Sequence, residues 1–286
     1  MNKHKNRGPR RRTRPADGRG AGWRSGPRGR KALGQHFLMD SGVLADIVGA
    51  LGPPSFPVVE IGPGTGQLTE ALLEAGHEVI ALEIEQRMLE HLRRRLQGHP
   101  RLVLVRGDAR ETDLHSLVPD EGEFLVAGNL PYFAASYITR RALEALTPPR
   151  LMVVMVQREV AREFAARAKL SLLAIGIQVF AEPELLFDVP PEAFDPPPAV
   201  WSSVVRLSTR PEPLVPRPEL ALFFNEVSRI FRSPRKQIHN GLGMEREAAA
   251  SVLAAAGIDP IRRPETLAIS EWLDLVRAIE AGRHDR

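Results

Sequence analysis

The chain has 286 residues, of which 43% are hydrophobic, and it contains no cysteine. This composition excludes disulfide bonds and thiolate metal sites and is typical of a reducing compartment, so we expect a cytoplasmic location. The sequence has neither a run of about 18 apolar residues nor an apolar N-terminal core, so we expect no membrane span and no signal peptide.

Positive charge is concentrated at the N-terminus, although the net charge of the chain is only +4. Residues 1–31 hold twelve Lys or Arg and one acid, a balance of +11, whereas the remainder holds 27 basic and 34 acidic residues, a balance of −7. A segment so rich in Arg, Gly and Pro cannot bury a core, so we predict a disordered basic tail over 1–31 that is attracted to polyanions. The alternatives are a solvated tail without a partner and a start site placed too far upstream.

Residues 32–210 alternate apolar runs with amphipathic stretches. We expect strands over 57–61, 78–82, 102–105, 124–128 and 151–156, and helices over 68–75, 86–96, 136–146 and 158–168. This alternation predicts an α/β fold, a Rossmann-like and mostly parallel sheet with helices on both faces. Ligands of such sheets bind at the carboxyl ends of the strands.

The pattern changes after residue 156. Residues 172–187 and 201–207 are expected to be further strands that form an antiparallel hairpin at the sheet edge, with a proline-rich loop over 190–198. Residues 211–218 (PEPLVPRP) indicate a stiff linker. Helical patterns follow over 219–231, 234–241, 245–256 and 270–281. The linker and a small C-terminal helical domain thus span 211–286.

A glycine-rich turn, EIGPGTGQLT (60–69), follows the first of these strands. Its glycines allow a ligand to approach the backbone closely. The spacing G-x-G-x-G, headed by Glu60, differs from the G-x-G-x-x-G that places a pyrophosphate on a helix N-terminus, which argues against a dinucleotide oxidoreductase. Glu60 would repel a pyrophosphate but suits a cationic ligand.

Acids also follow the next two strands, at Glu83 and Asp108. An acid at the end of the second strand can accept hydrogen bonds from both hydroxyls of a ribose, and Asp108 is placed to accept one from an adenine amine. Any one of these carboxylates could instead be a solvated helix cap. Three acids at successive strand ends, without a lysine clamp, point to a nucleoside that carries no phosphates. S-adenosyl-L-methionine fits that description.

The apolar run 124–128 ends in Asn129-Leu130-Pro131-Tyr132. A strand that brings a carboxamide, a rigid carbonyl and an aromatic face to one point makes a socket for a planar amine. Any strand would end at this proline, however, because proline donates no backbone hydrogen bond.

The order and spacing of several motifs are specific when the motifs are taken together. They are GQHFL (34–38), the glycine turn with Glu83, GDA (107–109), NLPY (129–132), VQREV (156–160), FDPPP (194–198) and RSPRKQIHNGL (232–242). They resemble the rRNA adenine N6-dimethyltransferases, most closely the small-subunit enzymes of bacteria. The resemblance implies S-adenosyl-L-methionine as cofactor, no metal, and a monomer that dimethylates two adjacent adenines in a hairpin loop of small-subunit rRNA during ribosome biogenesis.

Carried over position by position, the resemblance also implies a role for each matching residue. The cofactor would lie against Gln35, His36, Leu38, Glu60, Gly62, Gly64, Glu83, Ile84, Asp108, Ala109 and Asn129. Asn129 and the Pro131 carbonyl would hold the target amine between Tyr132 and Phe194, unless Phe194 is a core residue. RNA contacts are expected on a different ground: because residues 32–286 are acidic overall, they must come from local basic groups, namely Arg158, Arg232, Arg235, Lys236 and His239, each of which could instead belong to a solvated helix face.

The chain departs from the family pattern at several positions. The loop over 165–171 is shorter than in the family, which puts RNA docking there in doubt. Ala199 stands where a lysine is expected, Trp201 replaces an acid, and His36 stands where Asn is commoner.

Two rival functions remain open. A resistance methyltransferase acting on large-subunit rRNA shares every catalytic motif, although NLPY, the proline loop and RSPRKQIHNGL favour the small-subunit type. A non-catalytic rRNA-binding assembly or transcription factor could use the same scaffold, but the intact Asn129 socket argues against it.

Overall fold

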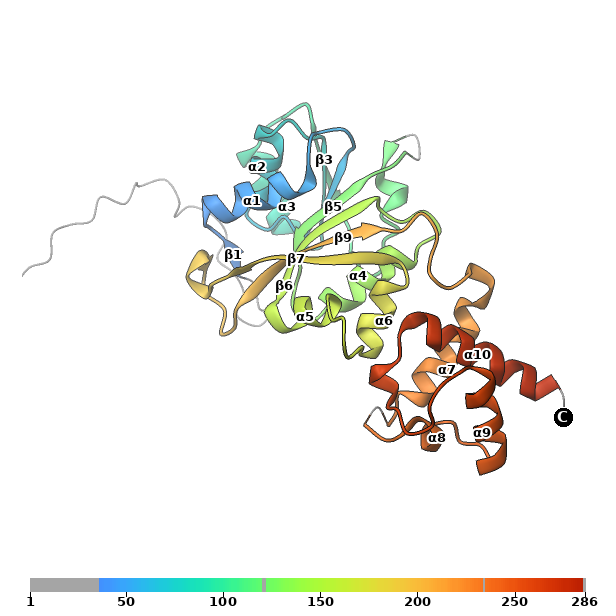
Figure 1. Cartoon of the computed structure of the whole chain (residues 1–286). Coiled ribbons are helices and arrows are strands. Elements are labelled where there is room, and N and C mark those ends of the chain that lie inside the picture. Colours follow the sequence, from blue (N-terminus) through green and yellow to red (C-terminus); the bar gives the residue numbers. More distant parts are fainter. Residues whose placement is uncertain (1–35, 120–121, 234, 285–286) are drawn as a thin grey trace, which may run out of the picture.

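The computed structural model describes residues 36–119, 122–233 and 235–284 (Figure 1). Seven strands form one sheet in the order β4-β3-β2-β5-β6-β9-β7, and β1 pairs with β8 in a separate ribbon. The strands are Phe37–Leu38 (β1), Val58–Ile61 (β2), Val79–Glu83 (β3), Leu102–Arg106 (β4), Leu125–Asn129 (β5), Leu151–Gln157 (β6), Ala181–Val189 (β7), Phe194–Asp195 (β8) and Ser202–Thr209 (β9). The helices are Ser41–Leu51 (α1), Gln67–Glu74 (α2), Gln86–Arg95 (α3), Ala135–Glu144 (α4), Arg158–Phe164 (α5), Leu172–Gln178 (α6), Leu220–Ile230 (α7), Ile238–Gly241 (α8), Arg246–Ala255 (α9) and Ile269–His284 (α10).

The pairs from β4 to β6 are parallel, which confirms the predicted α/β class. Side chains alternate between two core layers, because successive residues of a strand point to opposite faces. Along β2, Val58 packs with residues of α1 and α2, whereas Val59 packs in the cluster that contains residues of α4, α5 and α6. Strands buried on both faces read as continuous apolar runs, and for this reason the sequence located them.

Strands β2 and β5 are neighbours in the sheet although β3 and β4 separate them in the sequence. The chain runs from β2 to β3 and β4 on one side, then returns to β5 and β6 on the other. Glu60 lies opposite Ala127 in this parallel pair, so the turns after β2 and β5 leave the same edge of the sheet next to each other. Open sheets bind ligands at such a reversal of strand order.

The predicted antiparallel edge is present, but the strand expected over 172–187 is wrong in its first half. Strand β9 pairs antiparallel with both β6 and β7, and β7 begins only at Ala181, because the preceding residues form α6. Ser171 caps α6 by accepting the N–H of Ala174 at 3.0 Å. Residues 174–178 are buried all round the helix, so the segment has no polar face by which periodicity could distinguish helix from strand. Helix α1 and the β1–β8 ribbon have no counterpart among the predicted elements.

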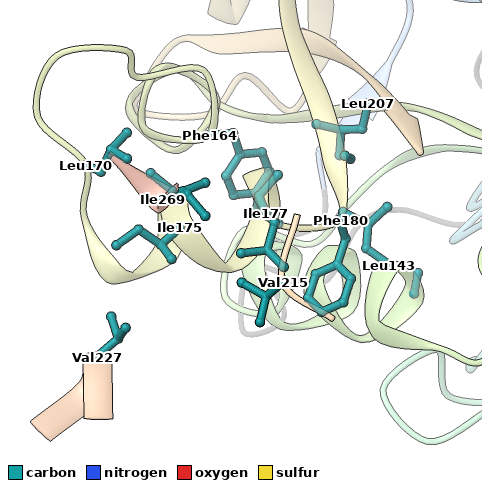
Figure 2. Packing of buried hydrophobic residues seen from close by; sticks show 14 of the residues in the cluster. Leu143, Phe164, Leu170, Ile175, Ile177, Phe180, Leu207, Val215, Val227 and Ile269 are labelled. Carbon is teal, nitrogen blue, oxygen red and sulfur yellow. The ribbon is translucent and has the colours of Figure 1, made fainter. Parts of the chain in front are cut away.

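The C-terminal helices pack against the sheet region through a shared apolar core. Phe180 stacks on Phe224 of α7 with ring centroids 6.1 Å apart, and Figure 2 shows Phe180, Val215 and Ile269 within the shared cluster. Val215 is fully buried, whereas the other residues of the predicted linker over 211–218 are exposed or half-buried. No helix of the described residues is long and apolar enough to cross a bilayer.

The helix expected over 234–241 is also wrong in its first half, because α8 contains only residues 238–241. Gln237 is extended, with φ −60° and ψ 145°, and Ile238 is held by a hydrogen bond of 2.7 Å from its N–H to the Arg262 carbonyl. This contact with a distant turn decides where the helix begins. The division into 1–31, 32–210 and 211–286 stays a prediction, and residues 1–31 lie outside the described part of the chain.

The Glu60 side chain of β2 is buried within the sheet. Glu60 is 1% exposed and accepts a hydrogen bond of 2.6 Å from Thr69 Oγ1. Burial raises the pKa of Glu60 to about 8, with a further upward contribution from the charge of Glu83 and an opposing one from the Thr69 hydrogen bond. A carboxyl whose pKa is higher in the folded than in the unfolded state stabilises the fold only while it is protonated.

We expect Gly128→Ala to destabilise the protein, because a Cβ at this position of β5 would lie 2.6 Å from the Ile61 carbonyl oxygen of β2. Overpacking of this kind typically costs about 1–3 kcal/mol, which urea unfolding would measure. Gly49→Ala is the matched control, since nothing lies within 4 Å of a Cβ there. Alanine is also the better helix former inside α1. Equal losses in the two variants would contradict the close approach of β2 and β5.

We expect Glu60→Gln to remove a pH dependence of stability. The contribution of Glu60 is complete below the unfolded pKa of 4.5 and is lost as the pH rises through about 8. The free energy of unfolding of the natural protein should therefore fall relative to that of the variant by at most about 1.4 kcal/mol per pH unit. Urea unfolding at intervals from pH 5 to 9 would measure this, and a constant difference between the two proteins would contradict the assignment.

Candidate active site

The turn after β2 exposes backbone at the reversal of strand order. Gly62 and Gly64 have φ angles of 69° and 56°, which strain any residue with a Cβ. Nothing lies within 4 Å of a Cβ built at Gly62, whereas one at Gly64 would lie 2.9 Å from the ring of Phe37. The turn thus offers bare backbone at Gly62, and the β1 ribbon packs against Gly64.

Glu83 connects the end of β3 to the glycine turn. Its carboxylate accepts the N–H of Gly64 at 3.3 Å and the N–H of Glu85 at 2.8 Å. Burial raises the pKa of Glu83, against these two hydrogen bonds, which lower it. A carboxylate has about four lone-pair sites, so Glu83 is oriented and can still accept hydrogen bonds from two hydroxyls. The next residue, Ile84, is 53% exposed and presents an apolar surface beside it.

Asp108, after β4, already has a partner. Arg110 donates to both of its carboxylate oxygens at 2.6 to 3.1 Å, and these bonds hold the pKa of Asp108 below its usual value. Ala109 lies between the two and is half-buried. The arginine carbon Cζ also lies 6.0 Å from the ring centroid of Phe133. A ligand amine that reaches Asp108 must share the carboxylate with Arg110 or displace it, and such half-exposed pairs are weak.

Asn129 ends β5 with an oriented carboxamide. Its Nδ2 donates to the His36 carbonyl at 2.9 Å, which leaves Oδ1 available as an acceptor. The His36 ring lies 2.7 Å, through Nδ1, from the Pro196 carbonyl, so Nδ1 carries the proton. His36 thereby connects Asn129 to the proline loop. Gln35, predicted beside it, lies outside the described residues.

The two carbonyls after Asn129 differ in their hydrogen bonding. The Pro131 carbonyl, predicted to hold the target amine, accepts the N–H of Ala134 at 2.9 Å. The Leu130 carbonyl accepts no hydrogen bond from any described residue. Leu130 is therefore the freer acceptor, and a motif alone does not distinguish the two.

Tyr132 is fixed at two points. Its hydroxyl shares a hydrogen bond of 2.6 Å with Ser202 Oγ, and its ring stacks near the His36 ring with centroids 6.1 Å apart and an interplanar angle of 24°. Burial raises the pKa of Tyr132, and the Ser202 bond opposes this. The phenol thus stays neutral and its ring has a defined orientation.

Phe194 and Leu38 pair with each other in the β1–β8 ribbon and are both buried. Phe194 is 4% exposed and Leu38 is 6% exposed, and both pack in the core cluster on the α1 and α2 side of the sheet. This placement supports the interpretation of Phe194 as a core residue. Its stacking on a target base stays a prediction and would require the ribbon to move.

The predicted RNA contacts fall at two places. Arg158 begins α5 at the carboxyl end of β6, with Cζ 5.4 Å from the ring centroid of Trp201. Arg232, Arg235 and Lys236 are exposed and form no ion pair with the described residues. His239 lies nearby, and its Nδ1 is 3.0 Å from the Pro260 carbonyl.

The structure adds residues that the sequence did not reveal, namely Phe37 against Gly64, Arg110 on Asp108, the Leu130 carbonyl and Ser202 on Tyr132. Phe37 and Leu130 lay within quoted motifs, but Arg110 and Ser202 had no signal in the sequence. Among the described residues, no three His, Asp or Glu side chains converge as metal ligands.

These residues fit S-adenosyl-L-methionine. The positive φ of Gly62 would strain any residue that has a Cβ, and the bare backbone of the glycine lets a ligand approach closely. The oriented carboxylate of Glu83 suits ribose hydroxyls, and Ile84 beside it suits the face of an adenine ring. The carboxylate of Glu83, which accepts the Gly64 N–H, also suits a positively charged ligand better than a phosphate.

Comparison with known proteins agrees with this geometry. The model of the family described as ribosomal RNA adenine dimethylase matches residues 26–280. A ribosomal RNA small subunit methyltransferase A from Dehalococcoides mccartyi (strain CBDB1) is 37% identical over 252 residues, which cover 86% of this chain and 87% of the relative. The protein of the same name from Desulfitobacterium hafniense (strain DSM 10664 / DCB-2) is 39% identical over 264 residues, which cover 90% and 94%.

Solved structures are similar over most of their length. The 23S rRNA methyltransferase ErmE is 29% identical, with a TM-score of 0.69 over 85% of this chain and 99% of that one. A dimethyladenosine transferase from Plasmodium falciparum is 23% identical and supports the fold, with a TM-score of 0.74 over 87% and 98%. The family match over nearly the whole chain and the fit of the glycine turn lead to one conclusion. The chain belongs to the ribosomal RNA adenine dimethylase family of S-adenosyl-L-methionine-dependent methyltransferases.

Proposed function

We propose that this protein dimethylates N6 of two adjacent adenines in a hairpin loop of small-subunit rRNA during assembly of the small subunit. The observation that carries the proposal is the carboxamide of Asn129. Its nitrogen is bound to the His36 carbonyl, and its oxygen is left as an acceptor at the sheet edge beside the glycine turn. A core asparagine would have both ends of its carboxamide hydrogen-bonded.

The chemistry requires two acceptors. The amine of adenine is a poor nucleophile, because its lone pair is delocalised into the ring. Acceptors that bind both amine hydrogens draw the nitrogen toward tetrahedral geometry and localise the lone pair. Asn129 Oδ1 is one acceptor and a main-chain carbonyl is the other. Neither group titrates near neutral pH, so the residues contribute by positioning the amine.

For the second acceptor, the structure favours Leu130 over the Pro131 carbonyl implied by the motif. The Pro131 carbonyl has one lone pair occupied by the Ala134 N–H. The Leu130 carbonyl is one residue from Asn129 and has no such partner among the described residues. We therefore assign the second hydrogen of the amine to Leu130. We call Asn129, the Leu130 carbonyl and the Tyr132 ring the target socket.

When bound, S-adenosyl-L-methionine supplies an already activated methyl group on its sulfonium. The chain's own residues must then bind and orient it. The groups proposed to do so are the backbone at Gly62 and Gly64, the carboxylates of Glu83 and Asp108, and the surface of Ile84 and Ala109, with Gln35, His36 and Leu38 toward the methionine end. Glu60 is buried against Thr69 and is mostly protonated at neutral pH, because burial raises its pKa to about 8, so it would contribute as a neutral group that supports the turn.

The target base has to leave its stack, because an adenine inside a helix cannot reach the socket. Tyr132, fixed by Ser202 and His36, would provide one stacking face. Phe194 would provide the other only if the ribbon opened, since the residue is buried here.

The relatives named above support the small subunit as substrate. Those named as small-subunit enzymes are 37% and 39% identical to this chain, whereas the 23S rRNA methyltransferase is 29% identical. A large-subunit enzyme that confers antibiotic resistance is the alternative, and a non-catalytic assembly or transcription factor is disfavoured by the oriented carboxamide.

RNA affinity would come from local basic groups, because residues 32–286 carry a net negative charge. We propose Arg158 at the sheet edge, and Arg232, Arg235, Lys236 and His239 in the helical region, as RNA contacts. Residues 1–31 would add affinity that is independent of sequence. We propose further that the enzyme is monomeric and cytoplasmic and that it acts on the immature subunit.

We expect methyl transfer to isolated small subunits or their immature form. Each subunit, prepared from cells that lack the modification, would be incubated separately with tritiated cofactor. Label in the small-subunit rRNA, with two modified adenines on mapping, is the expected result. Label only in large-subunit rRNA would establish the rival activity instead.

We expect Asn129→Ala to lower kcat by about 100-fold or more, the scale on which loss of one preorganised polar group acts, while cofactor affinity changes little. Asn225→Ala, an exposed residue of α7, is the matched control and should retain full activity. Titration calorimetry with the cofactor and single-turnover assays would separate binding from transfer. Normal turnover in Asn129→Ala would refute the role of the carboxamide.

A further inference from the structure

Trp201 lies at the sheet edge where β5 and β6 end. It precedes β9, and its carbonyl accepts the N–H of Arg158 at 3.0 Å. The next residue, Ser202, lies opposite the last residue of β6 and shares the hydrogen bond of 2.6 Å with Tyr132. Trp201 is therefore adjacent in sequence to the residue that fixes the aromatic ring of the target socket.

The indole of Trp201 is 42% exposed, whereas Trp272 is fully buried. A single exposed apolar side chain needs no special explanation. Here, however, the guanidinium carbon of Arg158 lies 5.4 Å from the centroid of the ring. The cation holds the indole in place while a large part of its surface stays open to solvent.

Arg158 forms no ion pair with an acid of the described residues, although its neighbour one helical turn on, Arg162, contacts Asp188. Its charge is therefore not neutralised locally. An exposed aromatic ring beside an uncompensated arginine is the combination that binds single-stranded nucleic acid, because the ring stacks on a base and the guanidinium attracts phosphate.

The backbone that carries the indole is rigid. Three prolines, at 196–198, restrict φ in the preceding loop, and the Pro196 carbonyl is held by His36 Nδ1. The Arg158 N–H fixes the carbonyl of Trp201 itself. A ring that is already positioned loses little conformational entropy when a ligand stacks on it.

We infer that Trp201, held by Arg158, is a stacking platform for an unpaired base next to the target adenine. The inference rests on the proposed function, since it takes the Tyr132 side of the sheet edge as the side that receives RNA. Extrusion of one base from a loop unstacks its neighbour, and that neighbour needs a new surface. The arginine beside the ring favours a polyanion over an apolar protein surface.

The test measures the affinity of the protein for a hairpin oligoribonucleotide and for a fully paired duplex of equal length. The hairpin carries the fluorescent base 2-aminopurine next to the loop adenines, so that its fluorescence reports binding. Trp201→Leu should bind the hairpin about tenfold more weakly than the natural protein, whereas Trp201→Phe, which keeps an aromatic face, should bind nearly as well. Leu146→Ala is the control, since Leu146 is 89% exposed and lies in the loop after α4. The melting temperature and the cofactor affinity of all three variants should equal those of the natural protein.

A fluorescence measurement gives a second readout. In a Trp23→Phe variant, acrylamide quenching reports on Trp201, because Trp272 is buried. Hairpin RNA should protect Trp201 from acrylamide, and the paired duplex should not. This protection does not depend on methyl transfer, so it would persist if the assigned substrate were wrong.

Two results would overturn the inference. One is that Trp201→Leu binds the hairpin as tightly as the natural protein does, while the hairpin leaves the acrylamide quenching of Trp201 unchanged. The other is a loss of affinity for small subunits without a loss for the hairpin, which would assign Trp201 to a contact with a ribosomal protein.

Discussion

The parallel pairing of β2 and β5 is the constraint on which the proposed chemistry depends. The two strands are distant in sequence but adjacent in the sheet, so the turn after one and the NLPY segment after the other emerge at the same edge. Gly128 permits this approach, because any side chain there would collide with the Ile61 carbonyl. A cofactor turn and an acceptor for the target amine can face each other only if this pair is close.

The hydrogen bonds around that edge orient acceptors and leave part of their capacity open. Glu83 is held by two backbone N–H groups, Asn129 by the His36 carbonyl, and Tyr132 by Ser202. Groups fixed in this way need little reorganisation when a ligand arrives. Asp108 differs, because its partner is an exposed arginine side chain, which competes with a ligand for the carboxylate.

Much of the sheet and the motif residues could be predicted from sequence, whereas their partners could not. Parallel strands buried on both faces are recognisable in the sequence as apolar runs. Helix α6, in contrast, is buried all round, so its sequence shows no helical periodicity. The two-residue strands β1 and β8 are too short to show any periodicity. Spacing and resemblance indicated Asn129, Glu83 and Asp108. The contacts that orient or occupy them join residues far apart in sequence, such as His36 and Asn129, and only the folded chain brings them together.

The contact between His36 and the Pro196 carbonyl has a consequence for biosynthesis. It joins residues 160 positions apart, and the same ribbon places His36 against Asn129. His36 is thus synthesised well before the proline loop, and its contact with the Pro196 carbonyl can form only after that loop has left the ribosome. Closure of so long a segment is slow compared with local folding, so catalytic competence is a late event in the synthesis of this chain.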